Sequence, residues 1–185
     1  MINILNIINI LIKMASSNNS ILDKIDSLKN NYYTENKKNT FFKNNQKFDC
    51  ANIIVQQMNK TDLFNSIIKI DENRLLFNYT MFKTIIHPAI YIDFIHFIFQ
   101  QNDTILQTHS MYDVIVDFKG LTMTGVERYK GFVTLLSNEG QRNGKNFLQK
   151  MGQVRIINPP FMISNIGKIL LPLMDQVVRD KIVIM

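Results

Sequence analysis

Tyr112–Phe118 (YDVIVDF), a run dominated by β-branched and aromatic residues, constrains the fold more than any other segment of the chain. Strands that are covered on both faces carry such near-continuous apolar runs, whereas half-exposed strands alternate between apolar and polar residues. Gly120 follows and supplies a turn that ends the strand. A strand of this kind lies inside a sheet, so the remaining sequence must provide neighbouring strands and covering helices.

The flanking segments alternate between strand-like and helix-like patterns. Bulky apolar runs predict three further strands, at Arg74–Phe82, Gln153–Ile157 and Lys181–Met185. Apolar residues spaced as on a helix predict helices over 88–101, 124–137 and 162–174, with shorter ones at Asp49–Asn59 and Thr61–Lys69. This alternation indicates an α/β fold, with a mixed, mostly parallel sheet, right-handed crossovers and flanking helices.

The first 47 residues differ in composition from the rest. Residues 1–13 form a short apolar run, and the stretch up to Lys47 is polar and rich in lysine. We therefore expect 1–47 to be a partly disordered extension and 48–185 to be the folded domain. The apolar run is shorter than the roughly 20 residues that span a bilayer, and no basic stretch precedes it as in a signal peptide. A cytoplasmic protein, in which Met14 is an alternative start, is the expectation.

The charge balance favours acidic partners. The chain has 21 Lys and Arg against 15 Asp and Glu, a formal net charge of +6. Anionic lipid, nucleic acid and an acidic protein all suit such a surface. The basic residues around Arg142 and Lys145 have no aromatic stacking motif beside them, so we expect no nucleic acid partner. A basic face that is simply solvated, or one that faces an anionic membrane surface, accounts for the charge. We expect peripheral membrane association.

The sequence gives little support for a catalytic site or a metal site. There is no glycine-rich phosphate loop, and the three histidines are separated by 9 and 13 residues without a thiol or carboxylate cluster. Cys50, the single cysteine, lacks a local base and is expected to be a buried structural thiol. Asp113 and Asp117 share one side of their strand, but solvation and turn capping by Asp117 explain them. We therefore expect a non-enzymatic protein without a metal or cofactor.

The C-terminal part of the chain resembles the CRAL-TRIO lipid-binding domain in three blocks that keep the family's order. Val114–Gly120 (VIVDFKG) is similar to the central strand and its Asp-aliphatic-x-Gly ending. Phe147–Phe161 (FLQKMGQVRIINPPF) matches the short helix, strand and Asn-(Pro/Ala)-Pro-Phe turn that precede the gate helix. Ile169–Met185 (ILLPLMDQVVRDKIVIM) matches the end of that helix and the closing Lys-Ile strand. The resemblance extends from about Arg74 to Met185.

This resemblance implies one lipid enclosed between the sheet and a movable, gate-like helix at 162–174. The residues that it implies for lipid binding lie on the gate helix and the central strand: Phe161, Met162, Ile166, Ile169, Leu170, Leu173, Val116 and Phe118. Taken by itself, the helix is equally compatible with ordinary core packing. Lys181 stands where phosphoinositide-binding members carry a headgroup-binding lysine. Gln149 stands at their glutamate, so it keeps hydrogen-bonding capacity without the charge.

The function implied is non-enzymatic binding or transfer of a single hydrophobic or amphiphilic lipid, such as a phospholipid or phosphoinositide. The expected partners are that lipid and an anionic membrane surface. A degenerate CRAL-TRIO-like module that binds a protein, for example a small GTPase, without any lipid is the alternative. A filled pocket favours lipid binding, and an occluded one favours the interaction module.

Overall fold

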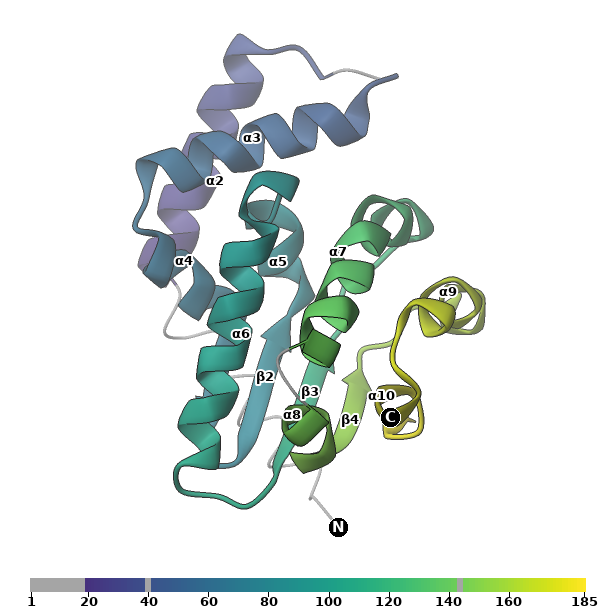
Figure 1. The fold of residues 1–185 in the computed structure, drawn as a ribbon. Coiled ribbons are helices and arrows are strands. Elements are labelled where there is room, and N and C mark those ends of the chain that lie inside the picture. Colours follow the sequence, from purple (N-terminus) through teal and green to yellow (C-terminus); the bar gives the residue numbers. More distant parts are fainter. Residues whose placement is uncertain (1–18, 39–40, 143–144) are drawn as a thin grey trace.

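The computed structural model describes residues 19–38, 41–142 and 145–185, so the expectations for 1–13 and Met14 lie outside the described residues. A five-stranded sheet in the order β1-β2-β3-β4-β5 organises the fold (Figure 1). β1 pairs antiparallel with β2, and every later pair is parallel. The expected mixed, mostly parallel sheet is confirmed. Its strands are β1 Ile68–Asp71, β2 Arg74–Asn78, β3 Tyr112–Asp117, β4 Met151–Ile157 and β5 Ile182–Ile184.

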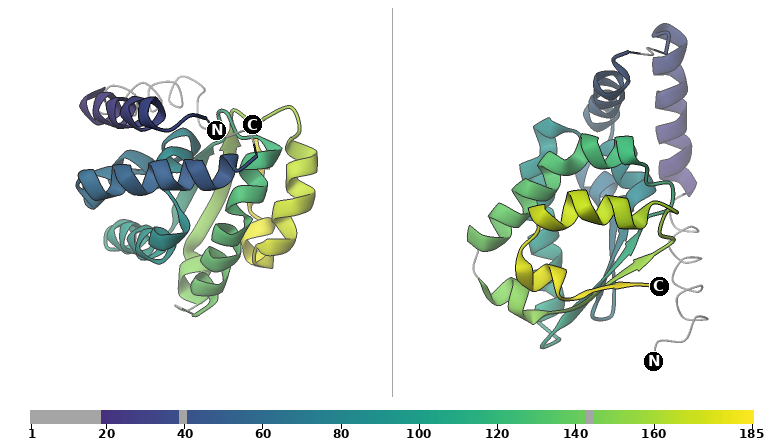
Figure 2. Two further views of the ribbon diagram at one scale, coloured as in Figure 1. Left: turned by 90° about the horizontal axis from the view of Figure 1, so that it is seen from above. Right: turned by 90° about the vertical axis from the view of Figure 1, so that its right-hand side faces the viewer.

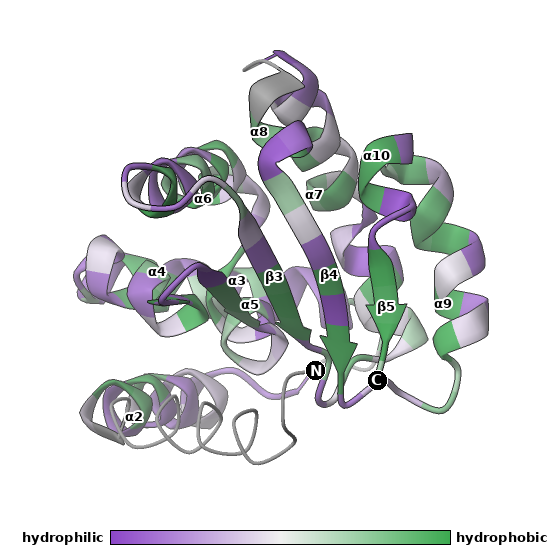
Figure 3. Cartoon of the chain, turned by 90° about the horizontal axis from the view of Figure 1, so that it is seen from below, coloured by the Kyte–Doolittle hydropathy of each residue, from purple (hydrophilic) through white to green (hydrophobic). Residues whose placement is uncertain are grey.

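Helices connect the parallel strands in sequence. Right-handed crossovers between strands that follow one another across a sheet place all the connecting helices on one face. Figure 3 shows α6, α7 and α10 on the same side of the strands. The connecting elements are α5 Tyr79–Ile85, η1 Pro88–Ile90, α6 Tyr91–Leu106, α7 Met123–Arg142, α8 Lys145–Lys150, α9 Ile163–Leu170, η2 Leu171–Leu173 and α10 Gln176–Arg179.

The strand register separates the two faces of the sheet. Val114 on β3 lies beside Leu75 on β2 and Val154 on β4, and these side chains face the connecting helices. Ile115 alternates to the opposite face, beside Arg155. Ile115 is only 4% exposed, so the central strand is buried on that face as well.

The predicted first strand is too long at its C-terminal end. β2 stops at Asn78, whose side chain accepts a hydrogen bond of 3.1 Å from the Met81 backbone N–H and caps α5. Tyr79, Phe82 and Ile85 then bury their side chains at helical spacing. An asparagine in the middle of an apolar run was the available signal, because Asn favours helix N-caps and is rare inside strands.

β1 was not predicted, because Thr61–Lys69 was expected to be helical. The helix α4, Lys60–Ile67, ends within that range, and the chain turns into a hairpin with β2. The expected turn at Asp71–Asn73 is confirmed, with Glu72 in the left-handed region at φ 57°. The β-branched isoleucines beside the turn favour the strand over a longer helix.

The N-terminal region is more ordered than expected between Asn19 and Glu35, the bounds of α2. The whole of this helix lies in the stretch that was expected to be a partly disordered extension, yet Tyr32 is 9% exposed and belongs to the hydrophobic core. α3, Lys43–Gln57, runs across the expected boundary between 47 and 48 and packs against α2 and α5. Figure 2 shows α2 and α3 from two further sides, at one end of the sheet. The division into 1–47 and 48–185 stays a prediction.

Within the described residues, no single helix is long and apolar enough to cross a membrane. Tyr79–Ile85 and Pro88–Leu106 reach the required length and hydropathy only together, and they are bent by 105° relative to each other.

Candidate functional site

An apolar cavity of about 240 Å³ lies between the sheet and the helices that cover it. Each layer of the fold contributes to its wall. The strands provide Ile68, Leu75, Phe77, Tyr112, Val114, Val116, Met151 and Val154, and Phe118 follows directly after β3. The helices α6, α7 and α8 provide Ile98, Phe99, Asn102, Phe132, Val133, Leu136, Ser137, Gly140, Phe147 and Leu148. The wall is completed by Met174, Asp175 and Val178 from the segment around α10.

The floor of the cavity is the central strand β3. Val114, Val116 and Phe118 share the face that points at the helices, and all three are only partly buried although they lie in the interior of the fold. Protein interiors are normally packed to the density of organic crystals, with few voids larger than a water molecule. Their residual exposure therefore marks space that the protein's own side chains leave unfilled.

Aromatic side chains stiffen the wall on the side of α6 and α7. Phe132 on α7 packs against Phe82 on α5, with ring centroids 5.0 Å apart, and against Tyr91, at 5.3 Å. Such edge-to-face and tilted ring pairs add to the stability gained from burial alone. This part of the cavity is consequently a preformed wall.

The opposite end is bordered by α8 and α10. Phe147 packs against Phe99 at 5.1 Å and against Tyr112 at 5.4 Å. Asp175 caps α10 by accepting a hydrogen bond of 2.8 Å from the Val177 backbone N–H. It also accepts a hydrogen bond of 3.1 Å from the side-chain amide of Gln141 on α7. This carboxylate therefore holds α10 against the end of α7, where Met174 and Val178 complete the wall.

The structure places only some of the residues that the resemblance implied for lipid binding in the cavity lining. Val116 and Phe118 line the cavity. Ile166 and Leu170 are buried on α9, which packs against α7, and they are not among the lining residues. Phe161 is fully exposed just before α9.

The remaining members of that set also lie away from the lining. Met162 is 43% exposed, while Ile169 and Leu173 are partly buried against the core. The role of all six in binding lipid stays a prediction. Met174 and Val178 were missed as lining residues, and so were the residues of α6 and α7, because apolar helical spacing is the same for a cavity wall and a packed core.

Asn158 sets the path into α9. It follows β4 with φ 49°, in the left-handed region that Asn tolerates better than most residues. Its side-chain amide donates to Asp117, at 2.9 Å, and Asp117 also accepts from the Lys119 backbone N–H at 2.9 Å. The predicted turn capping by Asp117 is thus confirmed, and the same carboxylate ties the turn after β3 to the turn after β4.

The two expected headgroup residues occupy different surroundings. Lys181 Nζ donates to the backbone carbonyl of Leu148, at 2.9 Å, and to that of Met151. Its ammonium group therefore caps the end of α8 next to the cavity wall. Gln149 is exposed on α8. Binding of a headgroup by either residue stays a prediction.

The side chains of Cys50 and Asp113 serve structural roles. Cys50 is 5% exposed, and burial raises the pKa of its thiol, which keeps it protonated and unreactive. Asp113 accepts a 2.9 Å hydrogen bond from Arg155 and one of 2.8 Å from the Gln153 backbone N–H. No three His, Cys, Asp or Glu side chains converge within residues 19–38, 41–142 and 145–185. The arrangement is suited to holding an apolar molecule.

No curated protein shows significant similarity to the sequence. A family model described as the CRAL/TRIO domain matches residues 75–185, from β2 to the C-terminal residue. This range covers more than half of the chain and contains all of the parallel strands except the first residue of β2, together with most of the cavity wall. The protein therefore belongs to the CRAL/TRIO domain family.

Proposed function

We propose that this protein binds one hydrophobic or amphiphilic lipid, without chemical conversion, in the cavity between β3 and the helices α6 and α7. CRAL/TRIO proteins are generally lipid-binding carriers and not enzymes. One observation about this chain carries the proposal: Val114, Val116 and Phe118 face an apolar space in the middle of the fold. Pockets for small ligands are typically concave and mostly apolar, with few polar groups.

Exposed apolar residues near α9 support contact with a membrane during loading or release. Phe161 is fully exposed, Met162 is 43% exposed and Leu171 is 38% exposed. Lys168 on α9 is also exposed. Apolar side chains next to a lysine suit the boundary between acyl chains and anionic headgroups. The basic surface of the chain adds attraction to such a leaflet.

The test is uptake of a neutral fluorescent apolar dye, N-phenyl-1-naphthylamine, together with native mass spectrometry of the purified protein. Val114→Phe places a larger side chain into the cavity from the rigid central strand. Val183→Phe is the matched control, because Val183 on β5 pairs with Arg155 on the opposite face and is 39% exposed. We expect the wild type and Val183→Phe to take up dye equally and Val114→Phe to bind it at least about tenfold more weakly, a loss of about 1.4 kcal/mol.

The mass spectrum gives an independent result. A bound lipid that survives purification and is lost in Val114→Phe supports the proposal. A folded wild type that neither carries a lipid nor takes up dye contradicts it.

The alternative is a protein-interaction module, and the exposed apolar side chains near α9 favour it as well. The two functions differ in what Val114→Phe changes. A protein partner that docks on Phe161 and Leu171 would bind this variant as well as the wild type. Phe161→Ser would weaken a protein partner or membrane binding while leaving dye uptake intact.

A further inference from the structure

Asn102 is a buried polar residue in the wall of an otherwise almost wholly apolar cavity. It lies on α6, is 2% exposed, and is in the cavity lining. Its Oδ1 has no hydrogen-bond partner in the described part of the structure. An unsatisfied buried oxygen of this kind destabilises the folded state relative to a satisfied one. Nearly all buried polar groups in native proteins do have partners.

Two of the other polar side chains in the lining, those of Asp175 and Tyr112, form hydrogen bonds within the protein. Asp175 accepts from the Val177 backbone N–H and from Gln141. The Tyr112 hydroxyl donates to the Phe147 carbonyl at 3.4 Å. Ser137 on α7 also lines the cavity, but its hydroxyl is not among the buried side-chain atoms that lack a partner. Asn102 is thus the lining side chain with a buried, unsatisfied hydrogen-bond acceptor, which is available to a ligand in the cavity.

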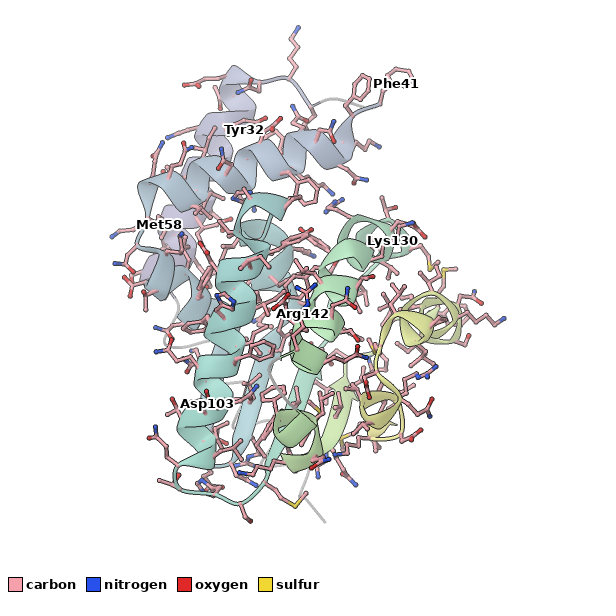
Figure 4. All side chains as sticks on the ribbon, viewed as in Figure 1. Tyr32, Phe41, Met58, Asp103, Lys130 and Arg142 are labelled. Carbon is pink, nitrogen blue, oxygen red and sulfur yellow. The ribbon has the colours of Figure 1, made fainter. Side chains whose placement is uncertain are left out.

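Its position defines one end of the cavity. Ile98 and Phe99 precede Asn102 by one turn of α6 and line the same space. Phe99 packs against Phe147, which packs against Tyr112. Asp103, labelled in Figure 4, marks this level of α6 on its solvent side. Asn102 therefore lies toward the end enclosed by these aromatic rings, away from α9.

The lining also restricts the charge and size of an occupant. Asp175 is the single charged residue among the described lining residues, and no Lys or Arg is present there to pair with a phosphate or carboxylate. The volume, about 240 Å³, lies below the range of about 300–1,000 Å³ that is usual for drug-sized ligands. A neutral molecule with one aliphatic chain fits this space better than a charged lipid with two.

We propose that the cavity selects a neutral, single-chain lipid alcohol, whose hydroxyl group is bound by the amide of Asn102. The inference rests on the proposed function, because it names the ligand class of the same cavity. A hydroxyl donates to the Asn102 carbonyl oxygen, and it also accepts from the amide nitrogen if the amide is rotated by half a turn. An ether of the same chain keeps the oxygen but cannot donate.

The experiment compares decan-1-ol with decyl methyl ether as competitors of bound N-phenyl-1-naphthylamine. For the wild type we expect the alcohol to compete about five- to tenfold better than the ether, from one hydrogen bond to an otherwise unpaired oxygen. Asn102→Leu should bring this ratio close to one while still binding the dye. Asn138→Leu, at an exposed position on α7, is the control and should keep the wild-type ratio.

The melting temperature of the ligand-free variants supplies a second readout. Replacing an unpaired polar group by an apolar one of similar shape is neutral or stabilising, so Asn102→Leu should melt at or above the wild-type temperature. A fall of several degrees would show that Oδ1 already has a partner such as a trapped water, and would overturn the inference.

Equal competition by both compounds in the wild type, or an unchanged ratio in Asn102→Leu, would overturn the inference while leaving the proposed lipid-binding function of the cavity intact. Failure of the wild type to bind dye or either compound would overturn both proposals.

Discussion

Lys181, the residue before β5, donates from Nζ to the backbone carbonyl of Leu148, 2.9 Å away in the last turn of α8. The same ammonium donates to Met151, the first residue of β4. Leu148 and Met151 both line the cavity. A residue expected to bind a headgroup thus fastens the edge strand to the cavity wall, and the two roles make different predictions.

Lys181→Met should lower the free energy of unfolding by about 1–3 kcal/mol, because it removes two charge-assisted hydrogen bonds. The two backbone carbonyls are then left with water as a partner or without any partner. The loss should be the same with and without lipid. Urea unfolding of the ligand-free protein measures it, and Lys168→Met, on the exposed side of α9, is the control without an expected loss. Unchanged stability together with weaker binding of anionic lipid would instead assign Lys181 to the headgroup.

His87 makes the protein less stable in mild acid. It is 4% exposed, and its Nε2 has no hydrogen-bond partner in the described part of the chain. Burial lowers the pKa of its imidazole, and the positive charge of Lys60 lowers it further. The unfolded chain, with a His pKa of about 6.5, then binds more protons than the folded one below that pH. Stability is therefore complete above pH 6.5 and falls as the pH drops from about 6.5 toward the lower folded pKa.

Chemical unfolding at several pH values between 7 and 5 tests this dependence. His87→Leu should flatten the slope in that window, whereas His96→Gln, at an exposed histidine, should keep it. An identical slope in the wild type and His87→Leu would show that His87 is not the responsible group.

Asn158 combines a left-handed backbone with a side-chain hydrogen bond to Asp117. Asn158→Ala loses both advantages and should cost about 1–3 kcal/mol. Asn158→Gly restores the backbone freedom and loses only the hydrogen bond, so it should cost less. Thermal unfolding ranks the two variants, and an alanine variant as stable as the glycine variant would remove the backbone from the explanation.

The parts of the fold that the sequence made predictable are those in which local pattern and burial agree. Tyr112–Phe118 was predicted as a strand covered on both faces because of its near-continuous run of β-branched and aromatic residues, and Gly120, with φ 74°, ends it as expected. Arg74–Phe82 failed at its C-terminal end because Tyr79 and Phe82 are as typical of a strand as of a helix. Only the capping hydrogen bond of Asn78 decides between the two.

The cavity was less predictable than the fold. Val116 and Phe118 could be placed because alternate residues along β3 and the extended residue after it share a face. Met174 and Val178 could not, because a four-residue helix such as α10 carries almost no periodic signal. Asp175, which accepts from Val177 as a helix N-cap, was the one local indication of that turn.

Two glycines of α7 should respond oppositely to alanine. Gly131 is exposed, and a Cβ there meets no atom within 4 Å, so Gly131→Ala should stabilise the protein by up to about 1 kcal/mol through helix propensity. A Cβ on Gly125 would collide with the hydroxyl of the buried Tyr79, so Gly125→Ala should destabilise it. Paired melting curves check both signs, and a stabilised Gly125→Ala would mean that Tyr79 moves aside without cost.

Ile166 decides whether α9 is core or lid in this state of the protein. It is 2% exposed, packs within the hydrophobic core and does not line the cavity. Ile166→Ala should therefore create a void in packed surroundings and lower the free energy of unfolding by about 2–5 kcal/mol, while the dye affinity of the folded fraction stays unchanged.

Leu136→Ala is the matched comparison on α7, because Leu136 is partly buried and lines the cavity. It enlarges a space that already exists, so it should cost less stability and change dye affinity. Urea unfolding and dye titration on both variants separate these outcomes. A stable Ile166→Ala that has lost dye binding would instead assign Ile166 to the ligand, as expected for a gate helix that lies over the cavity when lipid is bound.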